Sequence, residues 1–170
     1  PQVVGGNLSE AVEYFELEEG CPIILILGGS QGSVRLNEAV LSIISEATAR
    51  YQIIHQTGKN NFADVDGLSK ILLEQNQFKH RYHYYKFLDE SELRNASRAA
   101  SLVISRAGAG SIFEIAAWGL PAILIPLPEA AQNHQRENAY AYARTGACEV
   151  IEETNLTPHI LMAEAEKILK

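Results

Sequence analysis

The chain has 170 residues, 46% of them hydrophobic and 21% charged, which suits one folded domain with a real core and is too short for two large ones. Its net charge of −7, with 14 Lys and Arg among 21 acidic residues, argues against a surface built to collect nucleic-acid backbone. The two cysteines, Cys21 and Cys148, form no CxxC pair, so we expect neither a disulfide framework nor a zinc site. This use of cysteine is typical of a protein in a reducing cytoplasm. No apolar run approaches the roughly 20 residues that span a bilayer, so we expect a soluble protein or one that at most rests on a membrane.

Along the chain, short apolar runs alternate with longer segments of helical period, a pattern typical of a parallel sheet wrapped by helices. Residues 1–20 hold a Gly-Gly-Asn turn and an acidic helical stretch, so we expect an N-terminal segment there and a single domain at 21–170. The predicted strands are Ile23–Leu27, Tyr51–Gln56, Tyr82–Phe87, Leu102–Ser105, Ala122–Ile125 and Cys148–Ile151. The predicted helices run from about Val34–Arg50, Ala63–Gln75, Glu90–Ala99, Ser111–Trp118, Gln132–Thr145 and Thr157–Leu169. Asp89 and Glu92 have the spacing of a capping box, and Gly119-Leu120-Pro121 predicts a helix end.

Six β-α units predict a doubly wound, Rossmann-like α/β fold with a six-stranded parallel sheet, and the commonest strand order is 3-2-1-4-5-6. In that order the ligand crevice lies at the carboxyl ends of strands one and four. Both predicted strands are followed by small residues, Gly28-Gly29-Ser30-Gln31-Gly32 after the first and Ala107-Gly108-Ala109-Gly110-Ser111 after the fourth. The strand order and the Gly-rich turns therefore indicate the same crevice.

The turn after the fourth strand opens a helix with small residues, which leaves its backbone N–H groups and partial positive charge accessible to phosphate. We interpret Gly108, Ala109, Gly110 and Ser111 as a diphosphate site, with the Ser111 hydroxyl adding a hydrogen bond. A tight turn and close packing of helix on sheet would explain the same glycines equally well.

Polar side chains follow in two places. Glu114 lies on the first turn of the same helix, where its carboxylate could accept both ribose hydroxyls or simply stabilise the helix dipole. The run from Ala131 to Asn138, AQNHQREN, is rich in amides and holds an imidazole, groups that suit the hydroxyls and acetamido group of a sugar. Helix capping and a solvated face are the alternative there.

Three stretches in this order, GGSQGS with Leu36-Asn37 close behind, SRAGAGSIFEIAAWGLPAILIPLP and AAQNHQRENA, resemble the carboxyl-terminal domain of the MurG family. These bacterial glycosyltransferases, of glycosyltransferase family 28 type, make lipid II, and the likeness covers about Glu10 to the end. The resemblance implies one half of a GT-B fold that binds the donor UDP-N-acetylglucosamine. It also implies an inverting transfer to undecaprenyl-diphospho-N-acetylmuramoyl-pentapeptide, at the cytoplasmic face of the inner membrane, that uses no metal or other cofactor.

The resemblance assigns roles to individual residues. It implies that Ser30 and Gln31 border the nucleotide and diphosphate and that Leu88 meets the uracil through its backbone. Ala109, Gly110 and Ser111 would hold the diphosphate, and Glu114 the ribose. The residues implied to contact the N-acetylglucosamine are His134, Gln135 and Asn138.

Two departures from the family pattern stand out. Family members commonly carry Gly-Asn-Pro-Val-Arg where this chain reads Gly6-Asn7-Leu8-Ser9-Glu10, so the Arg near the nucleotide is missing. The amino-terminal domain, which carries the family's acceptor site for lipid I and its membrane-facing surface, is absent from the chain. We therefore name no general base and expect the missing half to be a necessary partner.

Other functions compete with this interpretation. Asp64-Val65-Asp66 spells the DxD of metal-dependent glycosyltransferases, but it precedes a predicted helix away from the crevice. A dehydrogenase would need GxGxxG and an acidic residue ending the second strand, where His55-Gln56-Thr57 stands. A nucleotide-sugar-binding module without catalysis, or the small subunit of a two-chain N-acetylglucosaminyltransferase, remains as an alternative.

Overall fold

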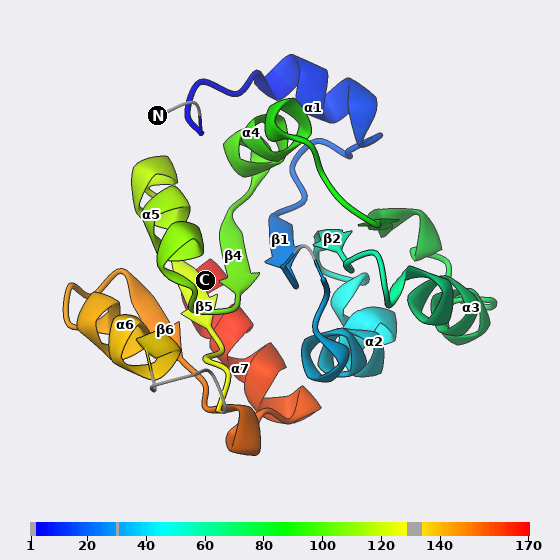
Figure 1. The fold of residues 1–170 in the computed structure, drawn as a ribbon. Helices are drawn as coiled ribbons and strands as arrows, with labels where there is room; N and C mark the ends of the chain where they lie inside the picture. The colour runs from blue at the N-terminus through cyan, green and yellow to red at the C-terminus, as the bar shows by residue number, and fades with distance from the viewer. Residues whose placement is uncertain (1–2, 30, 129–133) are drawn as a thin grey trace.

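A computed structural model describes residues 3–29, 31–128 and 134–170. Its six strands form one parallel sheet in the order β3-β2-β1-β4-β5-β6, which confirms the predicted order (Figure 1). The strands are β1 (Ile23–Leu27), β2 (Gln52–Gln56), β3 (Tyr82–Tyr85), β4 (Leu102–Ser105), β5 (Ala122–Leu124) and β6 (Cys148–Val150). β1 pairs with both β2 and β4. The strand order therefore runs outward from β1 to β3 on one side of the sheet and from β4 to β6 on the other.

The helices follow the predicted segments with small shifts at their ends. They are α1 (Leu8–Tyr14), α2 (Val34–Ala47), α3 (Phe62–Leu72), α4 (Glu90–Ala99), α5 (Ala109–Trp118), α6 (His134–Ala143) and α7 (Pro158–Leu169), with 3-10 turns at Lys79–Arg81 and Glu153–Asn155. The predicted start of α6 at Gln132 lies outside the described residues. None of the described helices is both long and apolar enough to cross a bilayer.

Local chemistry explains where several elements begin and end. The Asp89 carboxylate accepts the Glu92 N–H while the Glu92 side chain accepts the Asp89 N–H, which is the predicted capping box of α4. Gly119 ends α5 with a φ of 67°, as the Gly-Leu-Pro sequence predicts. The predicted end of β3 at Phe87 is wrong by two residues, because β3 loses its partner where β2 ends at Gln56, paired with Tyr85.

Alternate strand residues divide the core into two layers, one on each face of the sheet. Ile24 and Ile26 pack against α2, α3 and α7, whereas Leu25 and Leu27 pack against α1, α4, α5 and α6. Figure 1 shows α2 and α7 on the opposite side of β1 and β4 from α4. Strands buried on both faces are nearly all apolar, which is why the runs were readable in the sequence.

One buried polar network ties α2 to the carboxyl end of β2 and to Tyr82, the first residue of β3. Asn37 donates its amide N–H to the Thr57 carbonyl at 3.0 Å, so its Oδ1 faces His55 Nε2, also at 3.0 Å. His55 must therefore carry its proton on Nε2 and accept the Tyr82 hydroxyl on Nδ1, at 2.8 Å. Burial lowers the pKa of His55 from 6.5 to about 3, so the ring is neutral in the folded protein.

This network predicts a loss of stability in acid. The unfolded chain takes up a proton on His55 near pH 6.5 and the folded protein only near pH 3, so the free energy of unfolding falls as pH drops through that window. At pH 5 the expected loss from this group is about 2 kcal/mol. Urea unfolding of the wild type and of His55→Gln between pH 7.5 and 5 measures the difference in slope. The matched control is His159→Gln, at an exposed position on α7, which should keep the wild-type slope.

Candidate functional site

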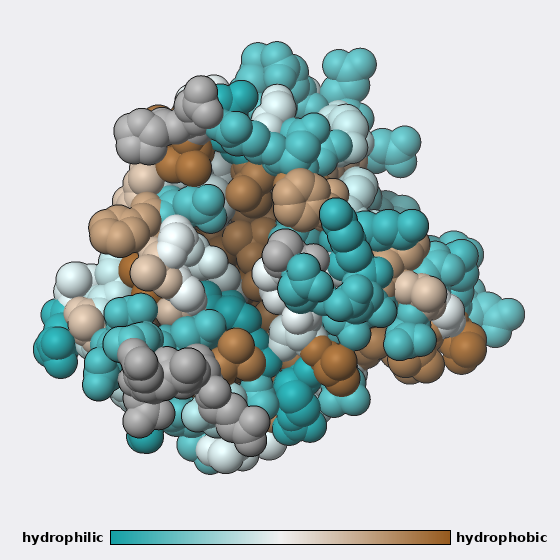
Figure 2. Space-filling view, viewed as in Figure 1, coloured by the Kyte–Doolittle hydropathy of each residue, from teal (hydrophilic) through white to brown (hydrophobic). Residues whose placement is uncertain are grey.

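A cleft of about 320 Å³ opens at the carboxyl edge of the sheet, beside the ends of β1 and β2 and between α4 and α5. Figure 2 shows it as a hollow with a hydrophobic floor in the middle of the face. The lining residues are Val3, Leu27, Gly29, Gln56, Phe87, Leu88, Glu90, Leu93, Arg94, Ser111, Glu114 and Trp118. The cleft therefore lies at the crevice that the strand order and the Gly-rich turns predict.

The N-terminus of α5 reaches this cleft without a capping side chain. Gly108 is its N-cap residue, no side chain accepts a hydrogen bond from its first turn, and that turn holds no acidic residue. In contrast, Asn7, Ser33, Asp89 and Thr157 cap α1, α2, α4 and α7. Ala109 and Gly110 are exposed, so the first N–H groups of α5 are available to an external anion.

Ser111 and Glu114 lie three residues apart on α5, and both line the cleft. Partial burial raises the pKa of the Glu114 carboxyl above its usual value. No described residue pairs with this half-buried carboxylate, and such a group gains most from a ligand that donates hydrogen bonds, such as a vicinal diol.

Leu88 also lines the cleft, but its backbone N–H is already engaged. The amide oxygen of Gln56 accepts that N–H at 2.9 Å, and the Leu88 side chain is buried in the core layer beneath α4. The backbone carbonyl is then the group of Leu88 that is left to meet a base. The contact between the Leu88 backbone and the uracil that the resemblance implies stays a prediction.

The other expected residues that the structure describes are not among those that line this cleft. Ser30 lies outside the described residues. Gln31 is exposed and accepts a hydrogen bond from Asn60 at 3.3 Å. His134, Gln135 and Asn138 share one side of the first turns of α6, and the Gln135 amide oxygen accepts the Leu127 N–H at 3.1 Å. These three side chains are thus brought together, but on a neighbouring element.

Beneath the two Gly-rich turns lies a buried arginine that the sequence analysis missed. Arg106, directly after β4, donates from Nε to the Ser33 hydroxyl at 3.0 Å and from Nη1 to the Ile125 carbonyl at 3.2 Å. Its Nη2 lies 2.5 Å from Glu153 Oε2, and the two side chains are only 9% and 15% exposed. One guanidinium therefore joins the segments that follow β1, β4, β5 and β6.

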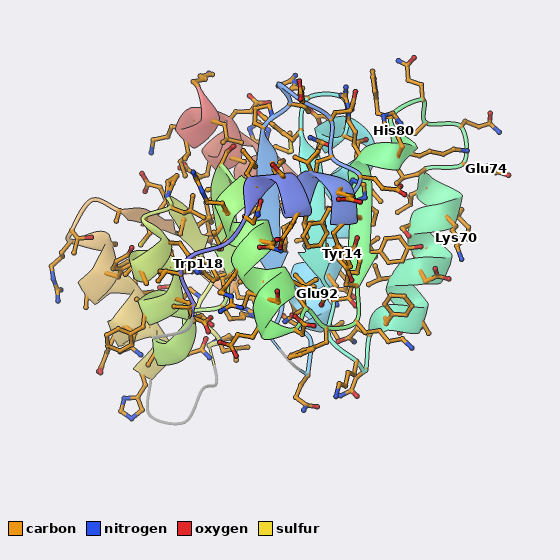
Figure 3. All side chains as sticks on the ribbon, turned by 90° about the horizontal axis from the view of Figure 1, so that it is seen from above. Tyr14, Lys70, Glu74, His80, Glu92 and Trp118 are labelled. Carbon is orange, nitrogen blue, oxygen red and sulfur yellow. The ribbon has the colours of Figure 1, made fainter. Side chains whose placement is uncertain are left out.

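The N-terminal segment supplies part of the cleft wall, which the sequence analysis also missed. The Trp118 indole N–H donates to the Val3 carbonyl at 2.8 Å across 115 residues, and Figure 3 shows Trp118 beside that segment. A Cβ on Gly6 would lie 2.1 Å from the Arg94 carbonyl, so only glycine lets the segment pack against α4. Neither contact could be predicted from the sequence, because each joins residues far apart in the chain that follow no regular spacing.

Glu10 stands where family members commonly carry an arginine, and it points elsewhere. Its carboxylate accepts hydrogen bonds from Asn7 and Asn95 at the exposed surface between α1 and α4. Arg94 from α4 is the cationic residue among those that line the cleft. The arginine of the family pattern is thus missing at Glu10, and Arg94 brings positive charge to the cleft.

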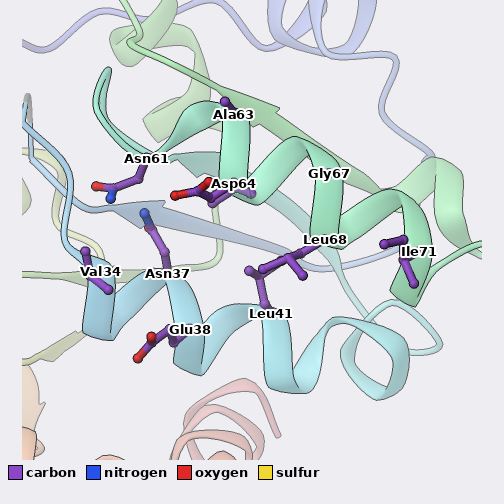
Figure 4. Close-up of a pocket in the computed structure, with 11 residues that line it drawn as sticks. Val34, Asn37, Glu38, Leu41, Asn61, Ala63, Asp64, Gly67, Leu68 and Ile71 are labelled. Atoms are coloured by element: carbon purple, nitrogen blue, oxygen red, sulfur yellow. The ribbon is translucent and has the colours of Figure 1, made fainter.

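The acidic pair Asp64 and Asp66 lies away from the cleft. Asp64 lines a separate groove of about 540 Å³ between α2 and α3, shown in Figure 4. The Asp66 carboxylate is held by Lys70 at 2.8 Å and by the Tyr84 hydroxyl at 2.7 Å. Within the described part of the chain, no three His, Cys, Asp or Glu side chains gather around a common metal position.

The parallel sheet, its strand order and the open cleft at the β1/β4 edge define a doubly wound α/β domain, one half of a GT-B fold. The sequence model of the glycosyltransferase family 28 C-terminal domain matches residues 23–170. The chain therefore belongs to this family, and the resemblance to the MurG carboxyl-terminal domain is confirmed.

Three similar proteins illustrate the match. The UDP-N-acetylglucosamine–N-acetylmuramyl-(pentapeptide) pyrophosphoryl-undecaprenol N-acetylglucosamine transferase of Thermodesulfovibrio yellowstonii is 38% identical over 171 residues, covering 99% of this chain and 44% of the relative. The crystal structure of Acinetobacter baumannii MurG superposes with a TM-score of 0.75 at 27% identity, covering 98% of this chain and 47% of that one. The solution structure of ALG13 shares the fold, with a TM-score of 0.60 at 20% identity and 88% of each chain covered. The chain spans less than half the length of the curated relatives it matches.

Because Glu153 pairs with the buried Arg106, we expect its substitution to lower the free energy of unfolding more than most single substitutions do. Glu153→Gln leaves the buried guanidinium without its counter-charge and should lower the free energy of unfolding by about 3 kcal/mol. Urea denaturation measures the change. The matched control is Glu152→Gln, which removes the partner of the exposed Arg136 and should cost under about 1 kcal/mol. Equal costs for the two variants would contradict a structural role for the buried pair.

Proposed function

We propose that this chain is the donor-binding half of a glycosyltransferase and that its cleft holds UDP-N-acetylglucosamine. The observation that carries the proposal is the cleft at the β1/β4 edge, where an uncapped helix N-terminus and a half-buried carboxylate line or border the same space. The names of the relatives support this donor. A net charge of −7 makes such local anion recognition necessary, because the chain as a whole repels a diphosphate.

Each part of the donor has a group that suits it. The diphosphate lies against the N–H groups of Ala109, Gly110 and Ser111, with Ser30 and Gln31 bordering it from the first Gly-rich turn. Glu114 accepts the two ribose hydroxyls, and the uracil lies against the segment at Leu88. The sugar reaches toward α6, where His134, Gln135 and Asn138 supply neutral donors and acceptors for its hydroxyls and acetamido group.

The proposed reaction is an inverting transfer of N-acetylglucosamine to undecaprenyl-diphospho-N-acetylmuramoyl-pentapeptide, which forms lipid II. Negative charge grows on the UDP leaving group as the glycosidic bond breaks. The fixed dipole at the start of α5 stabilises that charge without needing a metal or other cofactor. The acceptor site, the general base and contact with the cytoplasmic face of the membrane belong to the other half of the enzyme.

Glu114 provides the first test. Glu114→Ala removes the acceptor for the ribose hydroxyls, so UDP binding should weaken by about 1–3 kcal/mol, as measured by calorimetry. Glu90→Ala is the matched control, since it removes another carboxylate that lines the cleft and should leave the UDP affinity nearly unchanged. Unchanged affinity in Glu114→Ala would remove this residue from the site.

Gly110 tests the helix N-terminus itself. Outside its own helix, a Cβ at Gly110 would meet no atom of the described residues within 4 Å, so Gly110→Val should fold normally while its side chain occupies the space of the diphosphate. We expect UDP affinity to fall at least about tenfold, which corresponds to roughly 1.4 kcal/mol, with little change in melting temperature. Gly67→Val is the matched control, because Gly67 is also a helical glycine with open space around it but lies in the groove between α2 and α3. Normal UDP binding by Gly110→Val would contradict the proposed diphosphate site.

A further inference from the structure

The groove between α2 and α3 is a second hollow of the surface, and the proposed function does not use it. Its volume is about 540 Å³. Hydrogen bonds fix the C-terminal ends of the two helices to each other. The Ser45 hydroxyl donates to the Leu72 carbonyl at 3.1 Å, and the Asn76 amide donates to the Ser45 carbonyl at 3.0 Å. The chain itself therefore holds both walls of the groove in place.

Apolar side chains line this groove and stay open to solvent. Val34, Leu68 and Ile71 are 56%, 49% and 71% exposed. Figure 4 shows Leu68 of α3 pointing toward Leu41 of α2, with Ile71 further along the same helix. Single exposed apolar side chains are common on protein surfaces, but apolar side chains that gather in one groove mark a place where another molecule binds.

Gly67 lines the groove from the middle of α3, a position that is unfavourable for glycine because of its freedom in the unfolded chain. Its φ is not in the left-handed region, so the backbone does not require glycine. Outside its own helix, a Cβ at Gly67 would meet no atom of the described residues within 4 Å, so packing does not require it either. The missing side chain lets an occupant of the groove approach the α3 backbone closely.

Charge selects the kind of occupant. Glu38 and Asp64 are the charged residues in the described lining of the groove, which holds no Lys or Arg. Glu38 lies 3.5 Å from Arg35, in an exposed pair that contributes little. A second copy of the chain would bring another net charge of −7 and the same acidic lining, which opposes self-association. A segment that carries Lys or Arg beside apolar side chains suits both features.

We infer that the groove between α2 and α3 is a docking site for a basic amphipathic helix of another protein. The apolar side of that helix packs on Leu41, Leu68 and Ile71, and its Lys or Arg side chains pair with Glu38 and Asp64. The groove shares no lining residue with the cleft at the β1/β4 edge, so this inference does not rest on the proposed donor.

A synthetic peptide of about 14 residues that repeats Leu-Lys-Lys-Leu-Leu-Lys-Leu is the probe, and calorimetry with the full chain measures its affinity. Gly67→Val fills the groove, and Leu68→Ser removes an apolar contact from its wall. Each should weaken peptide binding at least about tenfold. Gly110→Val, which alters a helical glycine outside the groove, should keep the wild-type affinity for the peptide. A peptide with Glu in place of every Lys should not bind.

Another acidic hollow, between α1 and α4, provides the control for binding through charge alone. Glu10, Glu13, Asp89 and Glu92 line it. Glu13→Gln should leave the peptide affinity unchanged, whereas Asp64→Asn should lower that affinity and weaken its dependence on salt. The reverse pattern would place the peptide at the wrong surface and overturn the inference.

The remaining outcomes distinguish the occupants. Failure of the wild-type chain to bind the Lys peptide, or binding that Gly67→Val and Leu68→Ser leave unchanged, overturns the inference. A dimer in sedimentation experiments that Gly67→Val dissociates would assign the groove to a second copy instead. Binding by this chain but not by a longer protein that includes the other half of the enzyme would assign it to that half. Failure of the wild-type chain to bind UDP would contradict the proposed function alone.

Discussion

The parallel pairing of β1 with β4 is the constraint on which the rest of the structure depends. From β1 the chain crosses to β2 with α2 on one face of the sheet, and from β4 it crosses to β5 with α5 on the opposite face. The two helices therefore leave neighbouring strand ends in opposite directions. Side chains cannot fill the gap between them, so a cleft opens there, with a helix N-terminus in its wall.

The turns around this gap are held by polar groups that are themselves buried. Arg106 joins the segments after β1, β4, β5 and β6, and the neutral His55 network fixes the turn after β2 through Asn37 and Thr57. Both arrangements are costly to break, because each would leave a buried group without its partner. The uncapped start of α5 can stay open to a ligand because neighbouring turns, rather than a capping side chain, hold its position.

The sequence predicted what depends on local pattern and on strand order. Apolar runs located all six strands, the Asp89–Glu92 spacing located the start of α4, and the Gly-rich turns located the cleft with Ser111 and Glu114 in it. It could not predict contacts between residues far apart in the chain, such as the Gln56 amide taking the Leu88 N–H. Gln56 ends a predicted strand, on the same edge of the sheet as the Gly-rich turns. That position was the signal in the sequence that could have marked Gln56 as a residue of the cleft.

The N-terminal segment forms part of the cleft wall and therefore belongs to the candidate site. Val3 and Trp118 both line the cleft and are joined by a hydrogen bond, while Gly6 packs directly on the backbone of α4, which carries Arg94. Val3 and Gly6 both precede residue 23, where the match to the family begins. Because the wall consists of two segments that are separate in sequence, the cleft is complete only when residues 3–7 are seated between α4 and α5. Any displacement of that segment therefore alters the cleft beside Arg94 and Trp118.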